Sequence, residues 1–96
     1  MLERLTAADF APRLGDRFRL QAGEATTLEA ELIDVEEAAP TDGGRTPFSL
    51  VFRGPLEPLL PQSIYRFEHD TLEPFDVFIV PIGPDEAGMR YEVVFT

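Results

Sequence analysis

Pro47-Phe48-Ser49-Leu50-Val51-Phe52-Arg53-Gly54-Pro55 is the stretch of sequence that decides the fold. Every second residue from Phe48 to Phe52 is large and apolar, and this period of two is typical of a strand that buries one face. Proline stands at both ends of the stretch, so we predict a strand over residues 47–53. Its side chains can build a core but carry no catalytic group, so the stretch predicts an all-β domain without indicating a reaction.

Five further segments show strand patterns, and they lie at residues 17–20, 26–37, 63–69, 75–80 and 89–95. In the segment 26–37 the apolar phase shifts near Ile33 and Asp34, which indicates a β-bulge. The segment 75–80 is apolar on both faces, which is typical of a strand covered on both sides, and we expect Pro81 to end it. One core is predicted to take aromatic side chains from three strands, namely Phe48, Phe52, Phe78 and Tyr91.

A short helix is predicted before the first strand. Thr6, with Asp9 three residues later, matches a capping box, and Gly15 suits the exit. Pro12 lies too deep for a long helix, so we expect one or two turns with Phe10 and Leu14 facing the core. The segment 38–46 is the longest predicted loop and is expected to be the most mobile part of the chain.

Six strand segments joined by short links predict a single all-β domain over residues 1–96. We expect about six antiparallel strands that form a small barrel or a sandwich, with a short N-terminal helix.

The composition argues against several classes of function. The chain has 18 acidic and 8 basic residues and a formal charge of −10, and every basic residue is arginine. Negative charge opposes binding to nucleic-acid phosphates and to anionic membranes, so neither is expected as a partner. No cysteine is present for a disulfide or a thiol nucleophile. Residues 1–5 contain no apolar signal segment, so we expect a cytoplasmic protein, with export by a signal-less route as the alternative.

Several blocks of the chain, spread over most of its length, resemble one protein family. They are Asp9-Phe10-Ala11-Pro12 with Gly15 and Phe18, the stretch 47–55, Tyr65, His69, Phe78-Ile79-Val80-Pro81-Ile82-Gly83 and Tyr91-Glu92-Val93-Val94-Phe95. The chain resembles a family of bacterial all-β domains of unknown function, about as long as this chain and associated with phage-tail-collar-type proteins. The resemblance implies an all-β fold and no catalytic residues.

His69 is the only histidine, which excludes a site with several histidine ligands. Its neighbours Glu68 and Asp70 point to the other face of a strand, so we interpret the ring as structural. The only serines, Ser49 and Ser63, lack the context of a nucleophile elbow. We therefore predict no catalytic, cofactor-binding or metal-binding residue and no cofactor. An enzyme that uses His69 with a carboxylate is a weaker alternative, which requires His69 to line an open cleft.

Charged residues alternate with apolar ones on most of the strands. The arginines of the strands are expected to form cross-strand pairs with Glu29, Glu31, Glu68 or Glu92. Between Arg19 and Arg45 no basic residue occurs, although seven acidic residues do. A solvated acidic face is the structural interpretation and docking of a basic protein is the functional one, while calcium binding lacks the required loop spacing. The predicted docking residues are Glu29, Glu31, Asp34, Glu36 and Glu37.

We therefore expect a non-enzymatic protein-interaction or structural accessory domain, as part of a bacterial or phage-like assembly. The alternative is a β-barrel that binds a small ligand, which requires an internal pocket of about 300 Å³ or more. The oligomeric state and the identity of the partner do not follow from the residues.

Overall fold

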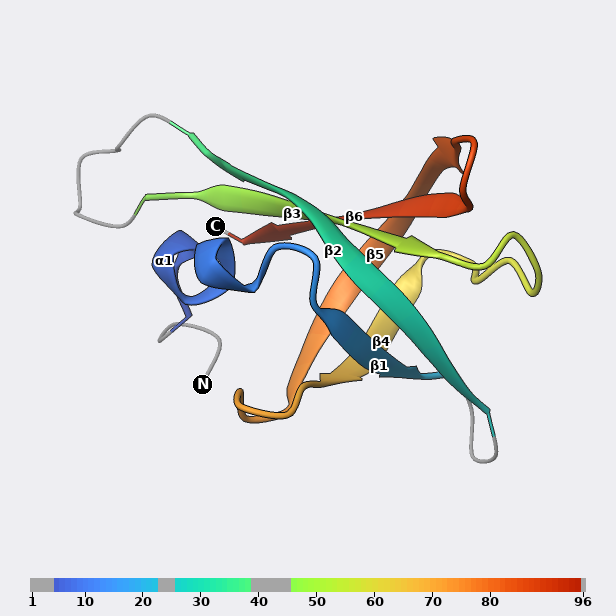
Figure 1. Cartoon of the computed structure of the whole chain (residues 1–96), viewed down its shortest axis with the longest axis horizontal. Coiled ribbons are helices and arrows are strands. Elements are labelled where there is room, and N and C mark those ends of the chain that lie inside the picture. Colours follow the sequence, from blue (N-terminus) through green and yellow to red (C-terminus); the bar gives the residue numbers. More distant parts are fainter. Residues whose placement is uncertain (1–4, 23–25, 39–45, 96) are drawn as a thin grey trace.

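The computed structural model describes residues 5–22, 26–38 and 46–95. Helix α1 (Ala7–Phe10) and the 3-10 turn η2 (Ala11–Arg13) precede the strands. The strands are β1 (Arg17–Gln21), β2 (Thr27–Glu37), β3 (Phe48–Gly54), β4 (Ser63–Glu68), β5 (Phe75–Pro84) and β6 (Met89–Phe95). They close into an antiparallel barrel in the order β1-β2-β3-β6-β5-β4 (Figure 1). The all-β prediction is confirmed, and the barrel is the correct alternative.

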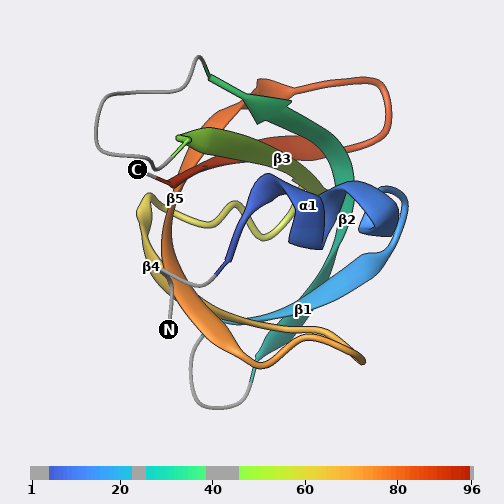
Figure 2. The same ribbon diagram turned by 90° about the vertical axis from the view of Figure 1, so that its left-hand side faces the viewer.

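Helix α1 lies across one end of the barrel (Figure 2). The predicted capping box forms, because the Thr6 backbone N–H donates to Asp9 Oδ2 at 2.8 Å. Phe10 is fully buried. Its ring contacts four others, those of Phe18, Phe48, Phe75 and Phe95. The helix therefore closes this end of the core with an aromatic side chain.

Leu14, which was predicted to face the core, is 50% exposed. The chain changes from an α-helix to the tighter 3-10 turn after Phe10, so the spacing that would align Leu14 with Phe10 is lost. The prediction for Leu14 is therefore wrong.

The connection between β3 and β4 runs at the barrel end opposite α1 (Figure 1). Leu60 from this connection is buried in the core, and its backbone N–H donates to the Tyr91 hydroxyl at 3.0 Å. The phenol therefore holds the connection against β6 and gives a buried amide a partner.

The inward-facing side chains of all the strands fill the barrel. Phe18, Leu32, Leu50, Phe52, Phe67, Ile79 and Val93 have no exposed surface. The aromatic core prediction holds for Phe48, Phe52 and Tyr91, but Phe78 is 49% exposed. A closed barrel has one inner face, so strict alternation turns Phe78 outward when Val77 and Ile79 point inward. The expectation that this strand is covered on both faces is therefore wrong.

Strand β5 also runs further than predicted, through Pro81 to Pro84. The register with β6 shifts between Pro81 and Gly83, and Gly83 has a φ of 108°. This irregularity accommodates a proline that cannot donate to the ladder.

The predicted bulge in β2 is confirmed by a register shift between Leu32 and Asp34. Leu32 pairs there with the chain that enters β1. Gly15 N–H donates to the Leu32 carbonyl at 2.8 Å, and Leu32 N–H donates to the Asp16 carbonyl at 3.0 Å. Of the predicted mobile loop, residues 39–45 lie outside the described residues.

Candidate protein-docking surface

One region of the outer surface carries exposed apolar side chains from three neighbouring strands. Ile64 on β4 lies directly opposite Phe78 on β5. Val94 on β6 follows Val93, which pairs with Ile79, so Val94 and Phe78 lie together on the outer face. The exposed fractions are 67% for Ile64, 49% for Phe78 and 59% for Val94. These values mark an apolar stripe across the sheet.

Carboxylates border this stripe where β2 and β3 continue the sheet. Glu36 pairs with Ser49, which pairs with Val94. In the next outward row, Asp34 lies across Val51 from Glu92. A hollow of about 280 Å³ brings acidic and apolar groups together, including Glu36, Glu37, Glu92, Phe48 and Val94. We call the combined surface the docking face, made of Ile64, Phe78, Val94, Asp34, Glu36, Glu37 and Glu92.

The carboxylates of the docking face are unpaired within the described part of the chain. Asp34, Glu36 and Glu37 are exposed, and no described basic residue forms an ion pair with them or with Glu92. The nearest ion pair on the other side of the stripe joins Arg66 to Asp76 at 3.2 Å, next to Ile64 and Phe78. The docking face therefore presents net negative charge around an apolar centre.

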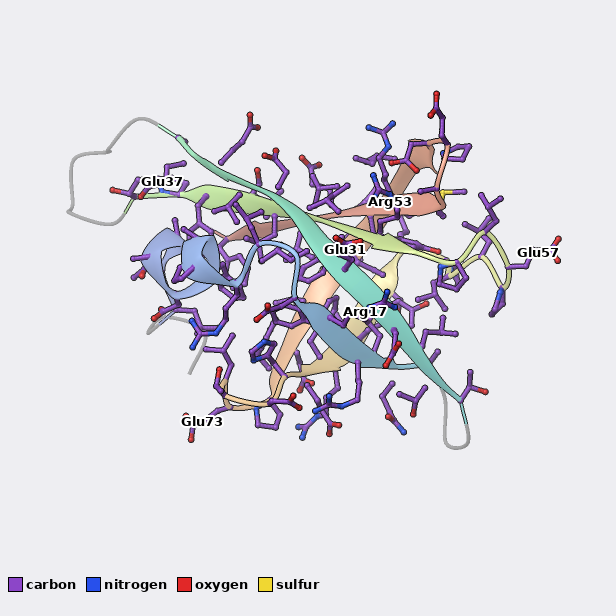
Figure 3. All side chains as sticks on the ribbon, in the orientation of Figure 1. Arg17, Glu31, Glu37, Arg53, Glu57 and Glu73 are labelled. Atoms are coloured by element: carbon purple, nitrogen blue, oxygen red, sulfur yellow. The ribbon has the colours of Figure 1, made fainter. Side chains whose placement is uncertain are left out.

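The other predicted docking residues lie in a different environment. Glu29 forms an ion pair with Arg17 at 3.4 Å, and Glu31 forms one with Arg53 at 3.8 Å. Figure 3 shows Arg17, Glu31 and Arg53 following one another across β1, β2 and β3, whereas Glu37 lies at the far end of β2. The structure thus separates the five residues into two groups. We call the region around Glu29 and Glu31 the paired face, made of Arg17, Arg19, Glu29, Glu31 and Arg53.

Arg53 forms the most extensive ion pair of the described residues. Its Nη2 lies 2.7 Å from Asp85 Oδ2, and its Nε donates to the same oxygen at 2.9 Å. The Asp85 carboxylate also accepts hydrogen bonds from the backbone N–H groups of Ala87 and Gly88. The Arg53 contact and these N–H groups lower the pKa of Asp85 to about 2, and the Asp85 carboxylate raises the pKa of Arg53. The turn between β5 and β6 is therefore attached to β3.

The predicted cross-strand pairs of Glu68 and Glu92 do not form among the described residues. Arg19 lies beside Glu68 in the register but forms its ion pair with Asp70, at 3.1 Å. Arg90 donates to the Gly83 carbonyl at 3.3 Å. Arg19 and Arg90 thus find other acceptors, and Glu92 stays without an ion pair among the described residues.

His69 is held by two partners and a ring contact, and its side chain is 7% exposed. The Thr71 backbone N–H donates to His69 Nδ1 at 3.1 Å, so Nδ1 accepts and the ring proton resides on Nε2. That Nε2–H donates to Asp16 Oδ2 at 2.9 Å. The ring also lies 4.5 Å from that of Phe18, measured between centroids. This arrangement fits the structural interpretation.

His69 does line a groove beside the Asp16 carboxylate, as the enzyme alternative requires. Both of its ring nitrogens are engaged, however, so no lone pair is free to accept a proton from a substrate. Ser49 and Ser63 lie on β3 and β4, and no described contact joins either hydroxyl to His69. Within the described residues, neither serine therefore lies beside His69, and the hydroxyl that does contact the ring is that of Thr71, 3.2 Å from Nδ1.

No described group of three or more histidine, aspartate or glutamate side chains is arranged to hold a metal ion. None of the helices in the described ranges is both long and apolar enough to cross a membrane.

The sequence contained part of the signal for the docking face. Alternation with Tyr65 and Phe67 places Ile64 on the outer side of its strand, and the same rule places Phe78 outside when Val77 is inside. The neighbourhood of Val94, Glu92 and Glu36 follows from the pairing of β6, β3 and β2, which one strand's pattern does not specify.

Fold and surface together define a class of protein, a small closed antiparallel barrel with a packed aromatic interior and an acidic-apolar outer face. The particular family follows from comparison with known families. The family described as a domain of unknown function, DUF6916, matches residues 5–95, and the chain belongs to this family. Comparisons with curated proteins and with solved structures gave no match.

Proposed function

We propose that this chain is a non-enzymatic protein-interaction domain that docks a basic partner protein on its docking face. The observation that carries the proposal is the exposed stripe of Ile64, Phe78 and Val94 beside carboxylates that no described arginine neutralises. Exposed apolar patches bordered by polar groups are typical of interaction sites. The stripe supplies area to bury, and the carboxylates supply charge selectivity.

Charge complementarity favours a basic partner over a second copy of this chain. The chain has a formal charge of −10, so two docking faces brought together would place like charges side by side. A partner with arginine or lysine around an apolar centre would bury the stripe and pair with Glu36 and Glu37. The packed barrel interior supports docking on the outer surface over binding of a small ligand inside.

The place of this domain in the cell is part of the same proposal. The sequence resemblance to bacterial domains associated with phage-tail-collar-type proteins supports an accessory role in a bacterial or phage-like assembly, with the chain itself cytoplasmic. A small domain with one docking face suits such a role, because it can bind one component of an assembly without enzymatic activity.

Photo-crosslinking in the organism of origin tests where the partner binds. Benzoylphenylalanine replaces Phe78 in one variant and Thr27 in the control, because Thr27 is exposed on β2 and outside the docking face. We expect one partner with a basic surface to crosslink at position 78 and not at position 27. Equal crosslinking at the two positions would contradict the proposed location.

Association kinetics with the purified partner then test the charge argument. Glu36→Arg with Glu37→Arg should lower the association rate by at least about tenfold at low salt, and the effect should fade as salt is raised. Glu29→Arg is the matched control, since Glu29 is an exposed carboxylate of the same strand that pairs with Arg17. An association rate indifferent to both the reversal and the ionic strength would contradict docking by charge.

A further inference from the structure

A second surface feature lies on the paired face and is independent of the docking face. A groove of about 620 Å³ runs beside His69, between the chain that enters β1, the strand β1 itself and the turn after β4. Its charged walls contain three arginines and three carboxylates, namely Arg13, Arg17, Arg19, Asp16, Glu29 and Asp70. The chain as a whole has 18 acidic and 8 basic residues, so the groove is richer in arginine than the rest of the chain, and the formal charges of these six residues cancel.

Part of the groove is held rigidly. His69 joins Asp16 to Thr71 through its two ring nitrogens. Arg13 donates to the Thr71 hydroxyl through Nη2 at 3.1 Å and also donates to the Asp9 carbonyl. These contacts connect α1, the entry to β1 and the turn after β4, so this part of the groove is formed before any ligand arrives.

Arg17 and Arg19 keep most of their hydrogen-bond donors. Each guanidinium has five N–H groups. Arg17 contacts Glu29 through one nitrogen at 3.4 Å, and Arg19 contacts Asp70 through one nitrogen at 3.1 Å. Arg53, by contrast, contacts Asp85 through two nitrogens. Arg17 and Arg19 therefore each keep more free N–H donors than Arg53 does.

The two arginines also project from the same side of the barrel. Phe18 between them is fully buried, so Arg17 and Arg19 both point outward, about 6–7 Å apart along the strand. That spacing lets two guanidinium groups contact one anionic group from two sides. Their present partners are exposed, with Glu29 at 60% and Asp70 at 84%, so both carboxylates can turn into solvent when a ligand takes their place.

We propose that this groove binds the phosphate or carboxylate group of a small ligand. Arg17 and Arg19 are the direct donors, because guanidinium groups match the geometry of such oxygens and form charge-assisted hydrogen bonds with them. Arg13, held by Thr71, adds fixed positive charge to the wall. His69 is a positioning residue, which keeps Asp16 turned toward the ring.

NMR titration with inorganic phosphate, and separately with acetate, tests the proposal. Ionic strength is held constant with sodium chloride, and the backbone amides and arginine Nε–H signals are followed. Saturable shifts are expected at residues 13–19 and 69–71, with a millimolar dissociation constant for these minimal probes. Saturation by phosphate alone would define a phosphate ligand, and saturation by acetate as well would extend the site to carboxylates. Linear shifts for both anions would overturn the proposal.

Matched variants separate specific binding from general attraction. Arg17→Gln with Arg19→Gln should weaken phosphate binding by at least about tenfold, and Arg17→Gln alone gives the same test if the double variant does not fold. Arg66→Gln is the control, because Arg66 is an exposed arginine in a single ion pair of 3.2 Å outside the groove. It should change the affinity by less than about twofold. Equal affinities of the double variant and the wild type, or the same loss in Arg66→Gln, would also overturn the proposal.

Discussion

The paired face and the docking face use the same kinds of residue in opposite ways. On the paired face, Arg17, Glu31 and Arg53 alternate in sign across three strands, so each charge has a neighbour of opposite sign. On the docking face, Glu36 lies in a row with Ser49 and Val94 and has no described basic partner. The first face pairs charges of opposite sign within the chain, and the second leaves carboxylates and apolar area without a partner among the described residues.

Strand β2 contributes acidic residues to both faces. Glu29 and Glu31 precede the bulge and lie on the paired face, whereas Asp34 and Glu36 follow it and lie on the docking face. One acidic run in the sequence is therefore two different surfaces in the fold. The division lies at the register shift, because the shift changes which side chains of β3 the β2 residues meet.

The largest effect is expected from comparing Phe52, inside the barrel, with Phe78 on the docking face. Phe52→Ala removes a fully buried ring and should lower the free energy of unfolding by about 3–5 kcal/mol. Phe78→Ala should lower it by less than about 1 kcal/mol, since half of the ring is already in water. Denaturant unfolding measures both. Equal losses would show that Phe78 stabilises the core and would remove the reason to see it as a contact residue.

The next effect concerns the turn that is attached to the paired face through Arg53. A Cβ on Gly88 would lie 2.2 Å from the Gly54 carbonyl oxygen and 3.1 Å from Arg53 Cγ. Gly88→Ala should therefore cost about 1–3 kcal/mol, because the backbone of β3 or the turn must move. Gly54→Ala is the control, since its Cβ would make only an ordinary contact of 3.7 Å with the Tyr91 ring. Thermal melts that do not distinguish the two variants would show that the turn is loosely packed.

A series of thermal melts at different pH values tests how much the Asp85 charge contributes to the Arg53–Asp85 contact. The pKa of Asp85 falls from 3.8 to about 2 in the folded protein, so its ionised form stabilises the fold above the unfolded-state pKa. That contribution is lost as the pH falls through the folded-state value. Wild type should therefore exceed Asp85→Asn in Tm at pH 7, and the gap should close between about pH 4 and pH 2. A gap that stays constant down to pH 2 would mean that the stabilisation does not depend on the Asp85 charge.

The smallest effect compares one glutamate from each face. Glu31→Gln leaves the guanidinium groups of Arg17 and Arg53 without the carboxylate between them and should cost less than about 1 kcal/mol, with the loss shrinking at high salt. Glu36→Gln removes an unpaired charge from an acidic surface and should leave stability unchanged or slightly higher. Unfolding curves of both variants at low and at high salt measure the difference. Equal losses of stability in the two variants would contradict the division into two faces.

The sequence predicted the strands well and the surroundings of individual side chains less well. Alternation in 47–53 and 89–95 placed Phe52 and Tyr91 in the core correctly, because the period of two is a local property of an extended chain. The phase shift at Ile33 and Asp34 marked the bulge for the same reason. Leu14 and Phe78 were misplaced because each position depends on a neighbour distant in the sequence or on a change of helix type.

The candidate site was predicted only in part, for a related physical reason. Local charge indicated that Asp34, Glu36 and Glu37 are solvated, and the structure agrees that they are exposed. The partners of Glu29 and Glu31 lie on β1 and β3, so only the register shows that these two carboxylates are paired.

By itself, the sequence determined that this chain is acidic and all-β with an aromatic core, since alternation, prolines at the strand ends and charge are all readable from near neighbours. Only the tertiary structure decided that the sheet closes into a barrel, which gives it one inner face and turns Phe78 to the solvent. It also decided which charges meet. Strand pairing brings together residues far apart along the chain, such as Arg53 with Asp85 and Glu36 with Ser49 and Val94, and no local pattern contains that information.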